Sequence, residues 1–273
     1  MATTPQVLDE PAAAVVTSVF QPGKLAVEVI SVDHDARPTP PIPILIAAPK
    51  DDAGTYPVAI LLHGFFLQNR YYEQLLKHVA SFGFIMVAPQ FALAGHNRGG
   101  HTAFSLALGY ANTSTSLKFS VLIGLDPVAG TGRSSQLPPA ILTYEPSSFD
   151  ITVPVLVIGT GLGDESENAL FPPCAPVDVN HTEFYRECRA PCYQLVTKDY
   201  GHLDMLDDYA PKLVTCLYKE GSSCKDVMRR TVAGIMVAYF KAIMGEEDGD
   251  LMDILKHPGL TPTTLDPVEY RLA

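Results

Sequence analysis

The sequence predicts an α/β protein with a mostly parallel sheet of eight strands and helices on both faces of the sheet. Short apolar runs of strand length recur along the chain. Most are continuous rather than alternating, which is typical of strands that helices cover on both sides. From the third run onward, apolar runs and helix-like segments take turns, which implies crossovers between parallel strands. We expect residues 1–273 to form one domain, because this length can bury a substantial core.

The expected strands follow one another at short intervals. They are residues 24–32, 43–48, 58–62, 84–88, 93–94, 119–125, 155–158 and 193–196. Two helices are indicated by apolar residues at helical spacing. One, over residues 75–82, should end at Gly83, since glycine readily takes the left-handed conformation that closes a helix, and the other, over residues 232–243, should end at Gly245.

The junction between the fourth and fifth runs is too short for two adjacent parallel strands. Only residues 89–92 separate the two runs, whereas such a connection needs about a dozen residues, usually a helix. Either the two strands are not adjacent, or a crossover segment is missing between Phe91 and Ala92. We favour the missing segment, and expect Phe91 and Ala92 to lie beyond bonding distance of each other.

Residues 95–100 read G-H-N-R-G-G, which is the nucleophile elbow G-x-S-x-G of serine hydrolases with Asn97 in the place of the serine. In this motif a sharp turn between a strand and a helix holds the central residue at positive φ above the end of the sheet. Asparagine tolerates that backbone better than most residues. Its carboxamide has no hydroxyl for a base to deprotonate. The motif therefore predicts an α/β-hydrolase fold without its nucleophile.

The catalytic acid and histidine of this fold follow the nucleophile along the chain in that order. His202 follows the eighth run in a polar turn, where a general base would lie over the edge of the sheet. Two aspartates are candidates for the acid. Asp126 ends the sixth run, and Asp164 follows the seventh, which is the commoner position and favours Asp164.

The third run ends in residues 63–66, H-G-F-F, which match the loop that supplies one backbone N–H to an oxyanion hole. The two donors would be the backbone N–H groups of Phe65 and of Arg98, the residue after the nucleophile position. Phe65, Phe66 and Leu67 would then line an apolar, substrate-binding entrance beside the reacting carbonyl.

Charge and composition exclude several partners and ligands. The formal net charge of −11 and the pI near 5.1 argue against nucleic acid and anionic membrane surfaces, because both attract lysine and arginine. No apolar run approaches the ~20 residues of a transmembrane helix. The five cysteines fit no zinc motif. His96 and His101 are spaced to lie on different helix faces, so we interpret them as structural and expect no metal site.

The elbow and its surroundings resemble the plant chlorophyllase family, whose form of the motif is G-H-S-R-G-G. Other segments that resemble it are residues 63–72, 124–130, 142–149, 154–163, 172–192 and 198–208. The resemblance implies a carboxylic ester hydrolase that cleaves the phytol ester of chlorophyll, or of a related phytylated pigment, to chlorophyllide and phytol. It assigns the acid to Asp126 rather than Asp164 and the base to His202. It implies no metal or organic cofactor.

The resemblance also implies a chloroplast location, with the cytosol or the endomembrane system as alternatives. The first 23 residues contain Asp9 and Glu10 but no lysine or arginine, so they lack the character of a transit peptide. The sequence indicates no particular oligomeric state.

The chain departs from the chlorophyllase pattern at Asn97 and at the short junction before the elbow. We interpret it as a nucleophile-knockout variant of a chlorophyllase-like enzyme. The alternative is a non-catalytic protein of the same fold that binds or carries an apolar ligand. A third hypothesis is conversion of Asn97 to an aspartate nucleophile.

Overall fold

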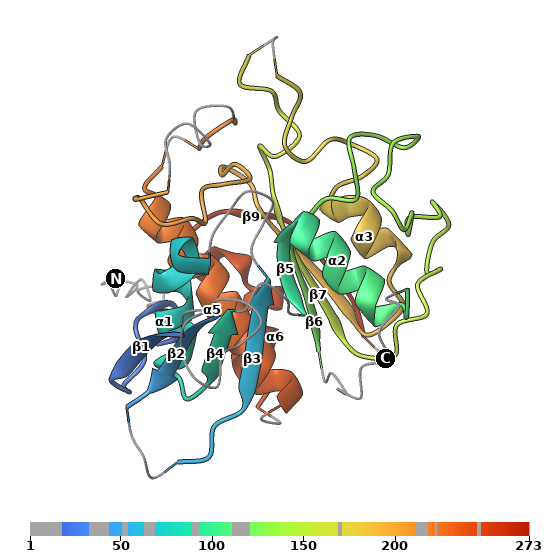
Figure 1. The fold of residues 1–273 in the computed structure, drawn as a ribbon. Coiled ribbons are helices and arrows are strands. Elements are labelled where there is room, and N and C mark those ends of the chain that lie inside the picture. The colour runs from blue at the N-terminus through green and yellow to red at the C-terminus, as the bar shows by residue number, and fades with distance from the viewer. Residues whose placement is uncertain are drawn as a thin grey trace, which may run out of the picture.

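The computed structural model describes residues 18–32, 44–50, 54–62, 69–88, 93–110, 121–168, 171–210, 218–221, 223–244 and 247–272 (Figure 1). The strands are β1 (Val27–Val32), β2 (Ile44–Pro49), β3 (Val58–Leu62), β4 (Ile85–Ala88), β5 (Ala94–Asn97), β6 (Leu122–Pro127), β7 (Val155–Thr160), β8 (Cys192–Thr197) and β9 (Leu265–Arg271). The α-helices are α1 (Glu73–Ala80), α2 (Arg98–Ala107), α3 (His181–Glu187), α5 (Lys225–Met244) and α6 (Gly249–Lys256). Short 3₁₀ helices are η1 (Ser18–Phe20), η2 (Asn69–Tyr72) and η3 (Pro258–Leu260).

These strands form one sheet in the order β1-β2-β4-β3-β5-β6-β7-β8-β9. The strands from β4 to β8 are parallel, whereas β1 and β2 at one edge and β9 at the other are antiparallel to their neighbours. The predicted fold class, a mostly parallel sheet in an α/β-hydrolase arrangement, is confirmed. The predicted number of eight strands was wrong, because β9 is an additional edge strand. Its residues, LDPVEYR, are mostly exposed and include a proline, which an edge strand readily accepts.

Helices cover both faces of the sheet, as predicted. In Figure 1, α2 and α3 lie on one side of the strands and α5 and α6 on the other. The side chains of β7 alternate between the two layers: Leu156 and Ile158 join the core on the α1 and α5 side, and Val155 and Val157 join the core formed with α2 and α3. Both helices predicted from apolar spacing are present as α1 and α5. Gly83 has the expected left-handed φ of 90°, in the turn after α1, whereas Gly245 lies outside the described residues.

The strands on either side of the short junction are not adjacent. β3 lies between β4 and β5 and pairs with both, with β4 along its first three residues and with β5 along its last two. β5 therefore begins about where β4 ends, two strand spacings or about 10 Å to the side. A few extended residues cover that distance. The premise of adjacent parallel strands was wrong, so the sheet alone does not require a missing helix. Phe91 and Ala92 lie outside the described residues.

A buried carboxylate at the end of α3 holds the loop between β6 and β7. Glu187 is fully buried, and its two oxygens accept hydrogen bonds from the backbone N–H groups of Thr143 and Tyr144 and from the hydroxyls of Thr143 and Ser148, at 2.6–2.9 Å. All of these groups donate to the carboxylate. An amide in its place would turn one acceptor into a donor that faces other donors.

We therefore expect Glu187→Gln to lower the free energy of unfolding by about 2–4 kcal/mol, the cost of unsatisfied buried donors to a charged acceptor. Denaturant-induced unfolding measures the change. Glu183→Gln, on the same helix, is the matched control: Glu183 pairs with Arg186 over 3.2 Å at the surface, and its loss should cost less than about 1 kcal/mol. Equal effects of the two substitutions would contradict this role of Glu187.

Candidate active site

The elbow has the geometry that the motif predicts. Asn97 is the last residue of β5 and the N-cap of α2, with φ 57° and ψ −126°. The positive φ expected at this position is confirmed. Gly95 is required by close packing inside the turn, because a Cβ atom there would lie only 2.1 Å from the carbonyl oxygen of Gly99. The strand, turn and helix thus present residue 97 at the carboxyl edge of the sheet.

Asn97, His202 and Asp126 form a continuous hydrogen-bonded row at this edge. The Asn97 Nδ2 atom lies 2.7 Å from Nε2 of His202, and Nδ1 of His202 lies 2.6 Å from Oδ2 of Asp126. His202 and Asp126 are almost completely buried. Asn97 and Asp126 lie at the carboxyl ends of β5 and β6, and His202 follows β8; these strands end at the same edge because they are parallel. Residue 97, a histidine and an ionised acid therefore stand in the order that a serine hydrolase requires.

The Asp126 carboxylate is held in place by more than His202. The hydroxyl of Thr160, the last residue of β7, donates to its Oδ2 over 2.5 Å, and the Thr160 backbone N–H donates to Oδ1 over 3.3 Å. Burial alone would raise the pKa of Asp126. The hydrogen bond and charge of His202, the nearby His181 and the Thr160 hydroxyl outweigh burial and hold this pKa below its ordinary value. The carboxylate is therefore ionised at neutral pH and can orient the imidazole.

The second candidate acid lies elsewhere. Asp164 is exposed in the turn after β7, whereas the hydrogen bond to His202 comes from Asp126 at the end of β6. The position of Asp164 along the chain suggested the acid, but the carboxylate beside the imidazole is that of Asp126.

The side-chain amide of Asn97 fixes the protonation pattern of this row. Its Oδ1 accepts a hydrogen bond of 2.6 Å from the backbone N–H of Arg98, the predicted oxyanion donor. A backbone N–H can only donate, so Oδ1 must face Arg98 and Nδ2 must face His202. Nε2 of His202 is then the acceptor, and Nδ1 carries the proton toward Asp126. This is the tautomer of a general base.

Comparison with known proteins places the chain in a family. The family model described as Chlorophyllase matches residues 15–93 and 90–272. The chain belongs to the chlorophyllase family. It is 41% identical over 294 residues to Chlorophyllase-2 of Arabidopsis thaliana, covering 87% of this chain and 92% of that protein. It is 41% identical to Chlorophyllase-1 of the same plant, over 93% of this chain and 92% of that protein. It is 36% identical to Chlorophyllase-1, chloroplastic, of Citrus unshiu, over 92% of this chain and 88% of that protein.

These chlorophyllases contain residues that have no counterpart in this chain. The three alignments extend over 294, 301 and 304 residues, more than the 273 of the chain. The family model matches in two stretches that meet at residues 90–93. The meeting point coincides with the short junction between β4 and β5.

An apolar cavity opens beside Asn97. Its volume is about 260 Å³, and its wall includes Val128, Phe171, Pro172, Pro173, Cys174 and Pro176. Burial raises the pKa of the Cys174 thiol to about 12, so it is a neutral part of the wall and not a substitute nucleophile. Phe65, Phe66 and Leu67, predicted to bind substrate and to supply an oxyanion donor, lie outside the described residues. The sequence did not identify residues 171–176 as part of the site, although their three prolines beside apolar residues indicate a rigid apolar wall.

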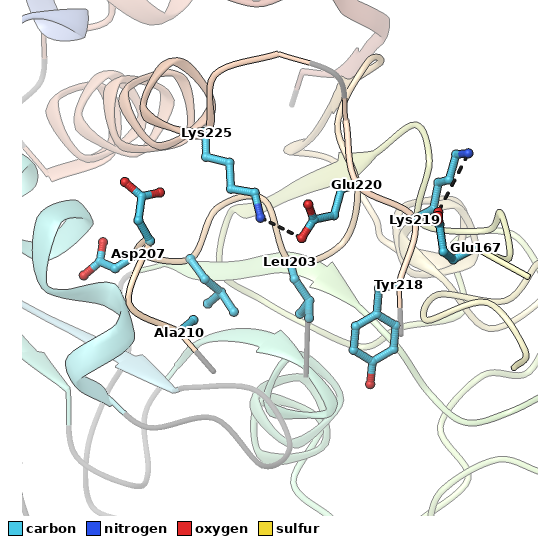
Figure 2. A pocket seen from close by; sticks show the side chains of 10 residues that line it. Glu167, Leu203, Asp207, Ala210, Tyr218, Lys219, Glu220 and Lys225 are labelled. Atoms are coloured by element: carbon cyan, nitrogen blue, oxygen red, sulfur yellow. Dashed lines mark hydrogen bonds and ion pairs between the residues drawn. The ribbon is translucent and has the colours of Figure 1, made fainter. Parts of the chain in front are cut away.

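A larger cavity lies on the far side of Tyr218, which lines both cavities. It measures about 550 Å³, and Figure 2 shows charged side chains around it, including the ion pairs of Lys225 with Glu220 and of Lys219 with Glu167. Asn97 is not among the described residues that line this larger cavity. The apolar cavity, although smaller, is therefore the one that borders the hydrogen-bonded row of Asn97, His202 and Asp126.

The described part of the chain shows no group of three or more histidine, cysteine or acidic side chains suited to hold a metal ion. His96 and His101 point to different partners, the His202 carbonyl and the Pro139 carbonyl, and do not converge. Of the five cysteines, the four that are described are free thiols. None of the described helices combines the length and the apolar character that crossing a membrane requires.

Proposed function

We propose that this chain is a chlorophyllase-type ester hydrolase scaffold in which Asn97 replaces the nucleophile, so that it binds a phytylated pigment ester without turning it over. The observation that supports the proposal is the row of Asn97, His202 and Asp126, with bonds of 2.7 and 2.6 Å. Such a row has a base aimed at residue 97 and an acid that orients the base.

A hydroxyl at position 97 would complete the reaction sequence. His202 Nε2 would take the hydroxyl proton as the oxygen attacks the ester carbonyl, and Asp126 would stabilise the imidazolium that forms. The backbone N–H of Arg98 would donate to the tetrahedral oxyanion, with the N–H of Phe65 as the proposed second donor. The imidazolium would then protonate the departing phytol oxygen. Water, activated by the same imidazole, would release the pigment acid.

The Asn97 amide obstructs this sequence at two points. Its Nδ2 donates a hydrogen bond to Nε2 of His202, the nitrogen that would accept the proton. Its Oδ1 accepts the hydrogen bond of the Arg98 backbone N–H. The ester carbonyl of a bound substrate would have to compete for that N–H. The apolar cavity, with Phe171 and the proline wall, is free of this obstruction and suits the hydrocarbon part of the ester.

Two further parts of the proposal rest on the comparisons. The relatives' extra residues and the two-part family match support the proposal that a segment is missing between Phe91 and Ala92. The name of the Citrus unshiu relative, Chlorophyllase-1, chloroplastic, supports a chloroplast location for this protein.

We expect the chain to bind chlorophyll in detergent micelles while releasing no measurable chlorophyllide, because covalent catalysis is lost and the apolar pocket is retained. Pigment fluorescence measures binding, and chromatography of the extracted pigment measures hydrolysis. Phe171→Asp should weaken binding about tenfold or more by placing a charge in the apolar wall. Tyr110→Asp, at another exposed aromatic residue outside that wall, is the matched control and should bind normally. Rapid hydrolysis by the unaltered chain would contradict the role assigned to position 97.

The Asn97 contacts also favour a second function, that of a non-catalytic carrier of apolar ligands. The amide satisfies both His202 and Arg98, so the fold needs no serine to keep the site ordered. The two functions differ in what happens when a hydroxyl is supplied at position 97: a knocked-out enzyme gains hydrolysis, and a carrier does not.

A further inference from the structure

His96 lies between the elbow and the loop that carries His202. It is the residue before Asn97 on β5 and is fully buried. Its Nε2 atom lies 2.9 Å from the backbone carbonyl oxygen of His202, and its ring faces the His202 imidazole, with centroids 4.4 Å apart and planes inclined by 32°. One side chain therefore contacts both the backbone and the ring of the proposed base.

The His202 carbonyl sets the tautomer of His96, and Tyr72 holds the other side of the ring. The Tyr72 hydroxyl, fully buried at the end of η2, lies 2.9 Å from His96 Nδ1. A carbonyl oxygen only accepts hydrogen bonds, so His96 Nε2 must carry the proton that it donates to His202. In the neutral imidazole, Nδ1 is unprotonated and accepts a hydrogen bond from the Tyr72 hydroxyl. Both ring nitrogens are satisfied with the imidazole neutral.

We propose that His96, held by Tyr72, is a positioning residue that sets the place of the His202 imidazole above residue 97; its catalytic consequence rests on the function proposed above. His202 lies in a loop after β8, and the bond to its carbonyl fixes this loop to the strand that carries residue 97. Within the described part of the chain, the titratable side chains that contact or act on His202 are Asp126 from β6, His181 from α3 and His96 from β5. His96, stacked against the His202 imidazole, supports that ring from one face.

His101 provides a matched comparison on the same elbow. It is also buried, and its Nε2 also bonds a backbone carbonyl, that of Pro139 over 3.0 Å, but this contact leads away from His202. Tyr71 is the corresponding comparison for Tyr72. It lies beside Tyr72 in η2, is also buried, and its ring packs against Tyr209. Each substitution can therefore be paired with the same substitution at a neighbour that does not contact the base.

The first experiment uses the chain as it exists and needs no activity. The His202 Nδ1 proton, which donates to Asp126, is observed by proton NMR. We expect a resolved signal in the unaltered chain and in His101→Gln, and a broadened or absent signal in His96→Phe, which keeps an aromatic ring but loses the bond to the His202 carbonyl. His96→Gln, whose amide can donate to the same carbonyl, should restore the signal. An unchanged signal in a folded His96→Phe chain would overturn the proposal.

The second experiment measures steady-state kinetics in the Asn97→Ser background. A misplaced base costs up to about 10²-fold in rate, so His96→Phe should lower kcat by about 10–100-fold with KM changed less than about twofold, because His96 does not line the apolar cavity. Tyr72→Phe should lower kcat several-fold, whereas Tyr71→Phe and His101→Gln should leave it within about twofold.

The two experiments separate the two proposals. Absence of hydrolysis in Asn97→Ser would reject the proposed function, while the NMR signal still reports on His96. If His96→Phe does not fold, the His202 Nδ1 proton signal and kcat are compared between Tyr72→Phe, His96→Gln and the unaltered residues instead. An effect of Tyr72→Phe no larger than that of Tyr71→Phe would then count against the positioning role.

Discussion

Asn97→Ser should raise the rate of chlorophyll hydrolysis from background by at least about 10³-fold. Loss of a triad nucleophile costs about 10⁶-fold in a model protease, and the remaining parts are already in place here: His202 has an accepting Nε2, and Asp126 is ionised behind it. The substitution supplies the hydroxyl and removes the amide from the Arg98 N–H in one step. Release of chlorophyllide, followed by chromatography, measures the gain.

Two controls distinguish nucleophilic catalysis by the new hydroxyl from the mere removal of the Asn97 amide. Asn97→Ala removes the amide without adding a hydroxyl, and should bind pigment but remain at background. Adding His202→Gln to the Asn97→Ser chain should abolish the gain. Mass spectrometry of the peptide around residue 97 verifies that the amide of the unaltered chain has not become a carboxylate. If Asn97→Ser binds pigment yet hydrolyses no faster than Asn97→Ala, the chain is a carrier and not a disabled enzyme.

The choice of acid gives the second large effect. In the Asn97→Ser background, Asp126→Asn should lower kcat by about 10⁴-fold, as the corresponding change does in a serine protease, because an amide stabilises the wrong histidine tautomer and no imidazolium. Asp164→Asn removes the same charge from an exposed turn after β7, and should change kcat less than about threefold. The reverse ranking would show that the hydrogen bond between Asp126 and His202 is not the catalytic one.

The sequence predicted the strands, helices and turns that have a clear pattern of apolar residues or a short motif of their own. β3 was predicted with its observed bounds, and the apolar stripe of α5 identified that helix. The elbow motif predicted the turn at Asn97 together with its positive φ. β9 was missed because an exposed edge strand with a proline has no buried pattern to detect.

Other features depend on contacts between distant parts of the chain. The Asn97 amide bonds both the adjacent Arg98 and a histidine 105 residues away, and this double contact follows only once β5 and β8 are placed in one sheet. The same holds for the proline wall beside Asn97 and for His96, which in sequence looks no different from His101. The sequence left two interpretations of the junction before the elbow, because sequence order alone does not show that β3 lies between β4 and β5.

The positive φ of Asn97 has a genetic consequence. Threonine could supply a hydroxyl, but a β-branched side chain is strongly disfavoured at φ 57°. Asparagine and serine both fit such a turn, and the asparagine codons AAU and AAC become the serine codons AGU and AGC through one base change. Under the proposed function, a single transition in this gene would therefore turn a product that only binds pigment into one that hydrolyses it.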